Sequence, residues 1–180
     1  SGPHLKQSDD CLNLNVWTPS ISDGQKRPVM VWLHGGGFSG GSSIESYAYD
    51  GENLSRTGNV VVISVNHRLN VMGHLDLTAY GKQYTQSANA GVMDLVSALQ
   101  WVKANAAAFG GDSNNVTIFG ESGGGAKVLT LMGTPAAKGL FHKAIVQSGA
   151  VEGMGMTLLA PQTTRRVAEL TLMNLGIKPE

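Results

Sequence analysis

Two glycine-rich motifs contain the groups of this chain that are best suited to chemistry. The first, residues 120–124, reads Gly-Glu-Ser-Gly-Gly and matches the pattern G-x-S-x-G. It comes directly after the apolar run 116–119 and before a segment, 126–132, that is expected to be helical. A serine in a sharp turn between a strand and a helix has an exposed hydroxyl group, and the helix N-terminus favours developing negative charge. Ser122 is therefore the candidate nucleophile of an acyl-transfer reaction.

The second motif, His-Gly-Gly-Gly-Phe, comes directly after the apolar run 29–33. Consecutive glycines allow backbone N–H groups to point into a cavity. With the N–H of the residue after a nucleophile, they can bind the oxyanion of a tetrahedral acyl intermediate. The candidate donors here are the N–H groups of Gly36, Gly37 and Gly123. A histidine in such a loop could also be a base or a metal ligand, but at the end of a strand His34 is expected to hold the loop in place.

Each motif also has an alternative interpretation. Gly-Glu-Ser-Gly-Gly alone could be an ordinary turn between a strand and a helix, and the triple glycine could be a phosphate-binding loop. The sequence contains no G-x-x-x-x-G-K-[ST], and no G-x-G-x-x-G that leads into a helix with an acid about 20 residues later. Finding both motifs in this order, each after its own strand, favours an acyl-transfer site.

The elements that must position the motifs alternate along the chain. Period-2 alternation or continuous apolar runs predict strands at 12–17, 29–33, 60–63, 116–119 and 144–146. Helical spacing or helix boundary residues predict helices at 90–108, 126–132 and 161–176. Alternating strands and helices predict an α/β fold with a mostly parallel central sheet, and no linker indicates a second domain.

The composition excludes several classes of partner. The chain has 180 residues, 42% of them hydrophobic, and a formal net charge of zero. With no run of Lys or Arg, it has no electrostatic footprint for nucleic acid or an anionic membrane. No apolar run approaches the length of about 18 residues that predicts a membrane span. The five histidines lack a metal-ligand spacing such as H-E-x-x-H, so we expect no metal and no cofactor.

The chain resembles the type B carboxylesterase family, which includes the cholinesterases and bacterial para-nitrobenzyl esterases. The segments that carry the resemblance are 8–19, 28–38, 65–69, 89–91, 109–112, 115–122 and 141–149. The resemblance implies an α/β-hydrolase fold, and hydrolysis of small-molecule carboxylic esters through an acyl-enzyme on Ser122. It also implies that Glu121 lines the floor of the site, and that Cys11 pairs in some members with a cysteine further upstream. This chain departs from the family pattern with Asp9 for glutamate, His67 for an aromatic residue and Gly123 for alanine.

The catalytic triad expected of this fold is incomplete within the chain. Its order is Ser, then Asp or Glu, then His. The only histidine after Ser122 is His142, and no acid lies between them. We therefore expect residues 1–180 to be the N-terminal portion of a single catalytic domain that lacks its C-terminal part. The triad acid and histidine would come from the remainder of the esterase, covalently joined or as a second chain. The alternatives are a non-catalytic, cholinesterase-like interaction module and an inert fragment of the fold.

Overall fold

The computed structural model describes residues 8, 10–21, 23–149 and 159–178. Their centre is one five-stranded sheet with the order β1-β3-β2-β4-β5. The strands are β1 (Leu14–Trp17), β2 (Arg27–Leu33), β3 (Val61–Val65), β4 (Gly111–Glu121) and β5 (Lys143–Gln147). β1 pairs antiparallel with β3, and the other neighbours pair in parallel.

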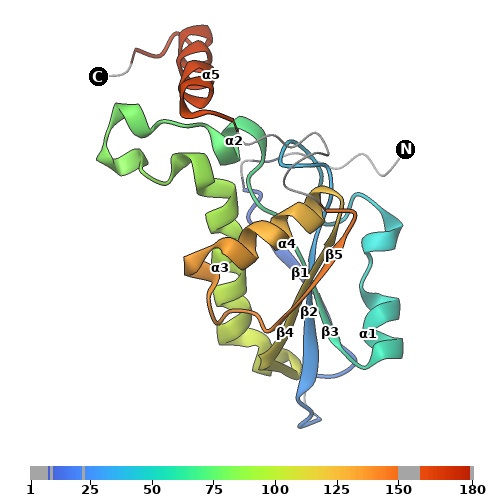
Figure 1. Ribbon diagram of the computed structural model, residues 1–180. Coiled ribbons are helices and arrows are strands. Elements are labelled where there is room, and N and C mark those ends of the chain that lie inside the picture. Colours follow the sequence, from blue (N-terminus) through green and yellow to red (C-terminus); the bar gives the residue numbers. More distant parts are fainter. Residues whose placement is uncertain (1–7, 9, 22, 150–158, 179–180) are drawn as a thin grey trace.

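Helices cover both faces of this sheet. The α-helices are α1 (Glu52–Gly58), α2 (Asn70–His74), α3 (Ala90–Asn105), α4 (Gly123–Gly133) and α5 (Pro161–Asn174). Short 3-10 helices lie at Tyr47–Tyr49, Thr78–Tyr80, Lys82–Tyr84, Ser87–Asn89, Ala106–Phe109 and Pro135–Ala137. Figure 1 shows α1 on one side of the sheet and α3 and α4 on the other, with α5 standing apart from the strands. No helix in the described part of the chain is both long and apolar enough to cross a membrane.

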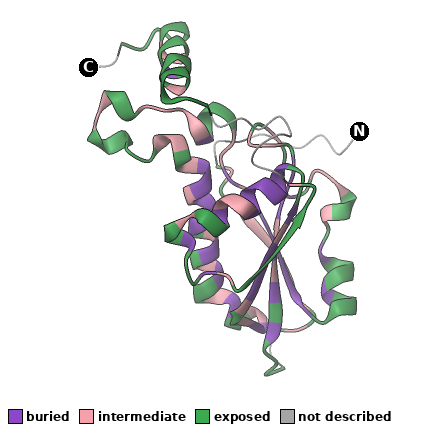
Figure 2. Cartoon of the chain, viewed as in Figure 1, coloured by how far each residue is buried: buried purple, intermediate pink, exposed green. Residues whose placement is uncertain are grey.

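The core lies between the sheet and helix α3. All five residues of β3 are buried, as expected of a strand covered on both faces. Its Ile63 is fully buried, and Leu95 and Leu99 of α3 belong to the same cluster. Figure 2 shows this arrangement as buried strands in the middle of the molecule and exposed outer faces on the helices. By contrast, β5 is exposed along its whole length, including Ile145 and Val146.

The predicted fold class and the predicted strands are confirmed. β4 is longer than predicted. It begins at Gly111, which pairs with Arg27 of β2. The predicted helix 90–108 is α-helical to Asn105 and continues as a 3-10 turn. Helix α4 begins at Gly123, three residues earlier than predicted. Helices α1 and α2 were not predicted.

Candidate functional site

The two glycine-rich motifs meet where the connections of two neighbouring strands diverge. β2 and β4 lie side by side in parallel, with Leu33 opposite Gly120. The chain after β2 leads to α1 on one face of the sheet, whereas the chain after β4 leads to α4 on the other. Such a divergence leaves a crevice at the carboxyl ends of the two strands, which is where ligands bind in open α/β sheets. Both motifs therefore occupy the place where this topology builds a site.

Ser122 lies at the tip of the turn between β4 and α4. Its backbone has φ 55° and ψ −121°, in a region that residues with a side chain rarely adopt, and the residue is exposed. The turn is held by two hydrogen bonds: the Ser122 N–H donates to Gln147 O over 2.8 Å, and Ala126 N–H donates to Ser122 O over 3.1 Å. This conformation presents the hydroxyl group outward at the N-terminus of α4.

Close backbone contacts explain the glycines on both sides of this turn. A Cβ atom at Gly120 would lie 2.5 Å from the carbonyl carbon of Gly124. A Cβ atom at Gly124 would lie 2.0 Å from Leu33 O. Because these neighbours are backbone atoms, they have little freedom to move away. The turn that carries Ser122 therefore requires glycine at both positions.

The loop after β2 brings its N–H groups to the same place. Gly36 and Gly37 have φ values of 78° and 62°, which a glycine adopts without strain. A Cβ atom at Gly123 would lie only 2.3 Å from Gly37 N, so the two glycines are in close contact. Within the described residues, the N–H groups of Gly36, Gly37 and Gly123 have no hydrogen-bond acceptor. Three donors without acceptors thus lie on the two segments that meet at Ser122, and a negatively charged oxygen could accept from them.

His34 is buried beneath this loop. Its side chain is fully buried, its Nδ1 lies 2.9 Å from Gly35 O, and its ring packs against that of His67 at 4.9 Å. Burial, reinforced by the positive charge of Lys127, lowers the pKa of His34 to about 4. The histidine is therefore neutral near pH 7, with Nδ1 donating to the carbonyl oxygen. This geometry suits the support of a loop, the role predicted for His34.

Glu121 is exposed at the end of β4, directly before the serine. Its Oε2 lies 3.6 Å from the position that a Cβ atom would take at Gly35, and its carbonyl oxygen lies 3.3 Å from that position. Burial raises the pKa of Tyr49, with smaller contributions from the charges of Glu45 and Glu121. Glu121 is thus next to the start of the loop at Gly35, and its place on the floor of the site stays a prediction.

The sequence also contained a residue whose place in the site was not predicted. Lys127 is fully buried in α4, and its Nζ contacts the loop after β2. A single charge within the apolar helix 123–133 was the available signal. Its partners lie 92 and 93 residues away in the sequence, so no local pattern could identify them.

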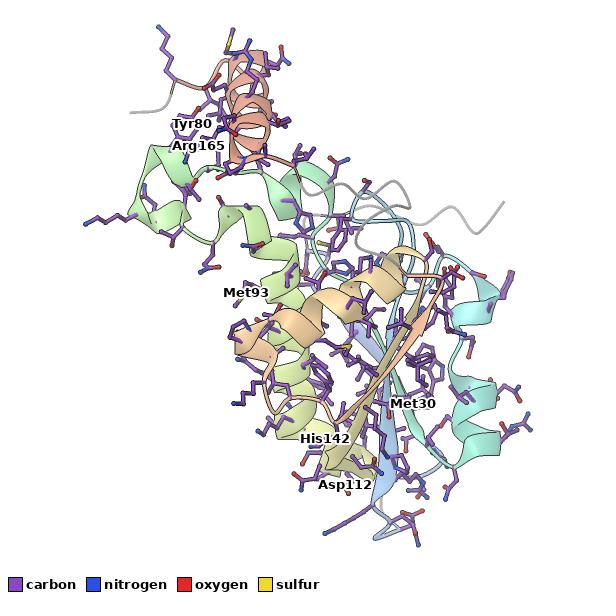
Figure 3. All side chains as sticks on the ribbon, viewed as in Figure 1. Met30, Tyr80, Met93, Asp112, His142 and Arg165 are labelled. Atoms are coloured by element: carbon purple, nitrogen blue, oxygen red, sulfur yellow. The ribbon has the colours of Figure 1, made fainter. Side chains whose placement is uncertain are left out.

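His142 lies far from Ser122. Its ring nitrogen Nδ1 accepts a hydrogen bond from the backbone N–H of Val116 over 3.1 Å, and the backbone N–H of His142 donates to Val116 O. Val116 precedes Ser122 by six residues along β4, which corresponds to about 20 Å at the usual rise of a strand. Figure 3 shows His142 beside Asp112, at the end of the sheet away from the start of α4. His142 therefore contributes to strand pairing and is out of reach of the serine.

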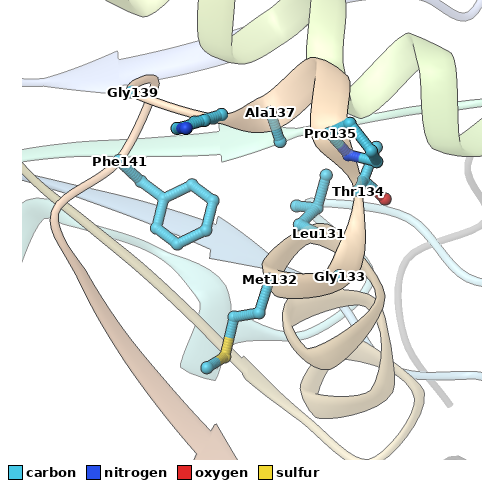
Figure 4. A pocket seen from close by; sticks show the side chains of 9 residues that line it. Leu131, Met132, Gly133, Thr134, Pro135, Ala137, Gly139 and Phe141 are labelled. Atoms are coloured by element: carbon cyan, nitrogen blue, oxygen red, sulfur yellow. The ribbon is translucent and has the colours of Figure 1, made fainter.

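A hollow at the C-terminal end of α4 lies apart from the site. It has a volume of about 220 Å³ and is lined by Leu131, Met132, Gly133, Thr134, Pro135, Ala137, Lys138, Gly139 and Phe141. Figure 4 shows mainly apolar side chains around it. Helix α4 separates it from Ser122 by about 15 Å, and its lining includes none of the predicted site residues.

Three histidines near the loop, two of them buried, are not arranged as a metal site in the described part of the chain. His34, His67 and His74 each have a buried ring nitrogen without a hydrogen-bond partner. Burial is the main cause of the lowered pKa of each of the three. In the described part of the chain, however, no group of three or more His, Cys, Asp or Glu side chains is arranged to hold a metal ion.

Two features define an α/β-hydrolase fold: the connections after β2 and β4 lead to opposite faces of the sheet, and the serine lies in a strained turn between a strand and a helix. Residues 1–176 match the carboxylesterase family, and the chain belongs to this family. It is 48% identical over 149 residues to para-nitrobenzyl esterase of Bacillus subtilis (strain 168), covering 83% of this chain and 30% of the relative. It is 44% identical over 168 residues to acetylcholinesterase of Gallus gallus, covering 93% of this chain and 21% of the relative.

Solved structures agree with this assignment. An esterase from the anaerobe Clostridium hathewayi, which can hydrolyse aliphatic aromatic polyesters, is 53% identical, with a TM-score of 0.90 over 99% of this chain and 36% of that structure. A para-nitrobenzyl esterase structure is 43% identical, with a TM-score of 0.87 over 99% of this chain and 37% of that structure. The chain therefore spans between a fifth and two fifths of the length of these relatives.

Proposed function

We propose that the protein is a serine esterase that hydrolyses carboxylic esters of small molecules. The observation that carries this proposal is the proximity of Ser122, in its strained turn, to the three N–H groups without acceptors. The related proteins act on different substrates, as their names state, and the carboxylic ester bond is the chemistry that a nucleophile with an oxyanion site attacks.

The reaction would proceed through an acyl-enzyme. The Oγ atom of Ser122 forms a bond to the carbonyl carbon, and the electrons of the C=O double bond move to the oxygen. The N–H groups of Gly36, Gly37 and Gly123 bind this oxyanion, and the alcohol then leaves. Water attacks the acyl-serine, and the carboxylic acid is released. A general base must take the serine proton and return it to the leaving alcohol.

The base and its acid partner would come from sequence outside residues 1–180, in a catalytic domain of which this chain is the N-terminal portion. Two observations support this. Among the described histidines, the one that follows Ser122 lies at the wrong end of the sheet. The exposed strand β5 also offers Ile145 and Val146 for a further part of the fold to cover. The remainder could be covalently attached or a separate chain.

The test is reaction of the natural full-length protein with a fluorophosphonate, followed by mass analysis of its peptides. We expect one adduct, on Ser122, and loss of both the adduct and ester hydrolysis in Ser122→Ala. Ser97→Ala is the matched control, because this exposed serine on α3 donates only to Met93 O. An active Ser122→Ala variant, or an adduct on another serine alone, would show that the proposed nucleophile is wrong.

A further inference from the structure

Lys127 has the largest of the fully buried side chains in the described part of the chain. It lies on α4, five residues after Ser122, with no exposed area. Burying a lysine is unfavourable unless its amino group has hydrogen-bond acceptors. The acceptors that Lys127 uses therefore indicate why a lysine occupies this position.

Among the described residues, the amino group of Lys127 contacts only the His-Gly-Gly-Gly-Phe loop. Its Nζ donates to His34 O over 2.9 Å and to Gly35 O over 3.4 Å. It also lies 5.8 Å from the centre of the Phe38 ring, a cation–π distance. One buried side chain on the helix of the nucleophile thus holds both the start and the end of the loop.

The contact with Gly35 O determines the direction of a neighbouring N–H group. The carbonyl group of Gly35 and the N–H group of Gly36 belong to one planar trans peptide, in which they point in opposite directions. Because Lys127 and Nδ1 of His34 both bind Gly35 O, the Gly36 N–H points away from them. A positive charge on the carbonyl side also polarises the peptide, which makes its N–H a stronger donor.

We propose that Lys127 is a positioning residue of the oxyanion site, which fixes the direction of the Gly36 N–H and strengthens it as a donor through the Gly35–Gly36 peptide. The inference rests on the proposed esterase function and adds a residue to its machinery. Lys127 itself does not touch the substrate in this mechanism. It acts only on the loop whose N–H groups bind the oxyanion.

The charges around Lys127 are compatible with this role. Burial lowers its pKa to about 7, and the charge of Glu45 opposes this shift. The neighbouring rings of His34, His67 and His74 have lowered pKa values and are neutral at pH 7, so they add no competing cation. Both the ammonium and the amine form of lysine carry N–H donors, so the hydrogen bonds to the loop persist through its titration. The polarising charge, by contrast, belongs to the ammonium form and is lost as pH rises through this pKa.

A direct role as the base of Ser122 does not fit these contacts. In the described structure, the hydrogen bonds of Lys127 go to carbonyl oxygens of the loop, and none joins it to Ser122. A base must lie within hydrogen-bond reach of the proton that it removes.

The test compares Lys127→Met with the wild-type protein in its full-length natural form. Methionine has a similar length but neither charge nor donors. We expect kcat for ester hydrolysis to fall by about 10- to 100-fold with little change in KM, because a weakened oxyanion donor affects the transition state more than the bound ester. The inhibition constant of a trifluoromethyl ketone, which forms an oxyanion on addition of the serine, should rise by a similar factor. Tm should change little, because the loss of the hydrogen bonds to the two carbonyl oxygens is offset by the removal of a buried charge.

Two further variants make the comparison specific. Lys103→Met is the matched control, because Lys103 Nζ also donates to a backbone carbonyl, Gly139 O at 3.2 Å, but on the exposed surface. It should leave kcat and the inhibition constant unchanged. Lys127→Gln keeps N–H donors without a charge, so its loss in kcat should be smaller than that of Lys127→Met. It replaces the methionine variant if the latter does not fold.

Several results would overturn the inference. They are an unchanged kcat and inhibition constant in Lys127→Met, a loss of kcat that only follows a lower Tm, or failure of both Lys127 variants to fold. Complete loss of fluorophosphonate labelling in a folded variant would instead assign Lys127 as the base. Failure of the proposed function itself is distinguishable, because the wild-type protein would then neither hydrolyse esters nor react with the fluorophosphonate.

Discussion

The backbones of Gly37 and Gly123 approach each other because position 123 has no side chain. A Cβ atom there would lie 2.3 Å from the nitrogen and 2.4 Å from the Cα atom of Gly37. The type B carboxylesterases that this chain resembles usually have alanine at this position. The His-Gly-Gly-Gly-Phe loop of this protein therefore lies closer to the start of α4 than an alanine would allow.

Gly123→Ala should consequently displace the loop and reduce activity. A displacement of about 1 Å at a reacting centre lowers rates by about 100-fold, so we expect kcat/KM to fall by about 10- to 100-fold. Steady-state hydrolysis of a chromogenic ester measures the effect. Gly133→Ala, at the other end of the same helix, is the control, because nothing lies within 4 Å of its added Cβ atom. Equal activity of the two variants would contradict the crowding seen at Gly123.

Among the elements, α3 supports the site through the segment that follows β3. Asp94 of α3 is largely buried and accepts three hydrogen bonds from Arg68: from the backbone N–H at 3.0 Å, from Nε at 2.8 Å and from one terminal nitrogen at 2.7 Å. Two residues later, the N–H of Asn70 donates to Phe38 O over 2.8 Å. Asp94 thus connects the core helix, through Arg68 and Asn70, to the end of the His-Gly-Gly-Gly-Phe loop.

Asp94→Ala should lower the free energy of unfolding by about 1–2 kcal/mol, because it leaves the backbone N–H and the partly exposed guanidinium of Arg68 without their acceptor. Urea unfolding of the full-length protein, followed by circular dichroism, measures this change. Glu169→Ala is the control, since its ion pair with Arg166 on α5 is exposed on both sides and should contribute less than about 0.5 kcal/mol. Similar losses for the two variants would show that the Asp94 pair is no stronger than a surface pair.

At the scale of the whole molecule, the β5 edge of the sheet is exposed within the described part of the chain. β5 is exposed along its length, and α5 has Ala168 as its only buried residue within the described chain. Val167, Leu170 and Met173 of the same helix are exposed. Exposed strand edges and apolar helix faces are sites at which further chain packs or copies associate.

Residues 1–180 produced alone should therefore associate and hydrolyse esters poorly. Without the triad histidine, the rate should fall at least about 1000-fold below that of the full-length protein. Light scattering measures the association, and ester hydrolysis per mole of chain measures the rate. A monomer of these residues with full activity would contradict the proposal that the acid and base lie outside them.

The sequence predicted the elements and residues that depend on local pattern. Continuous β-branched runs identified the central strands, and the spacing of Gly-Glu-Ser-Gly-Gly identified the serine turn, because its constraints lie within five residues. Helix α1 was missed because Glu52–Gly58 is mostly polar and lacks an apolar stripe. Lys127 was missed because lysines are normally exposed. Its burial depends on carbonyl groups more than 90 residues away, which only the folded chain brings together.

The backbone conformation of Ser122 also shows that the stability of the fold alone does not favour a serine at this position. Such a conformation costs of the order of 1–3 kcal/mol for any residue with a side chain, and glycine alone relieves it. Mutational drift in a protein that served only as a binding surface would gain stability by replacing this serine with glycine. Alanine would bring no such relief, so loss of the hydroxyl alone is not favoured either. The strain at Ser122 is thus a cost that the proposed reaction at its hydroxyl group explains and that the fold alone does not.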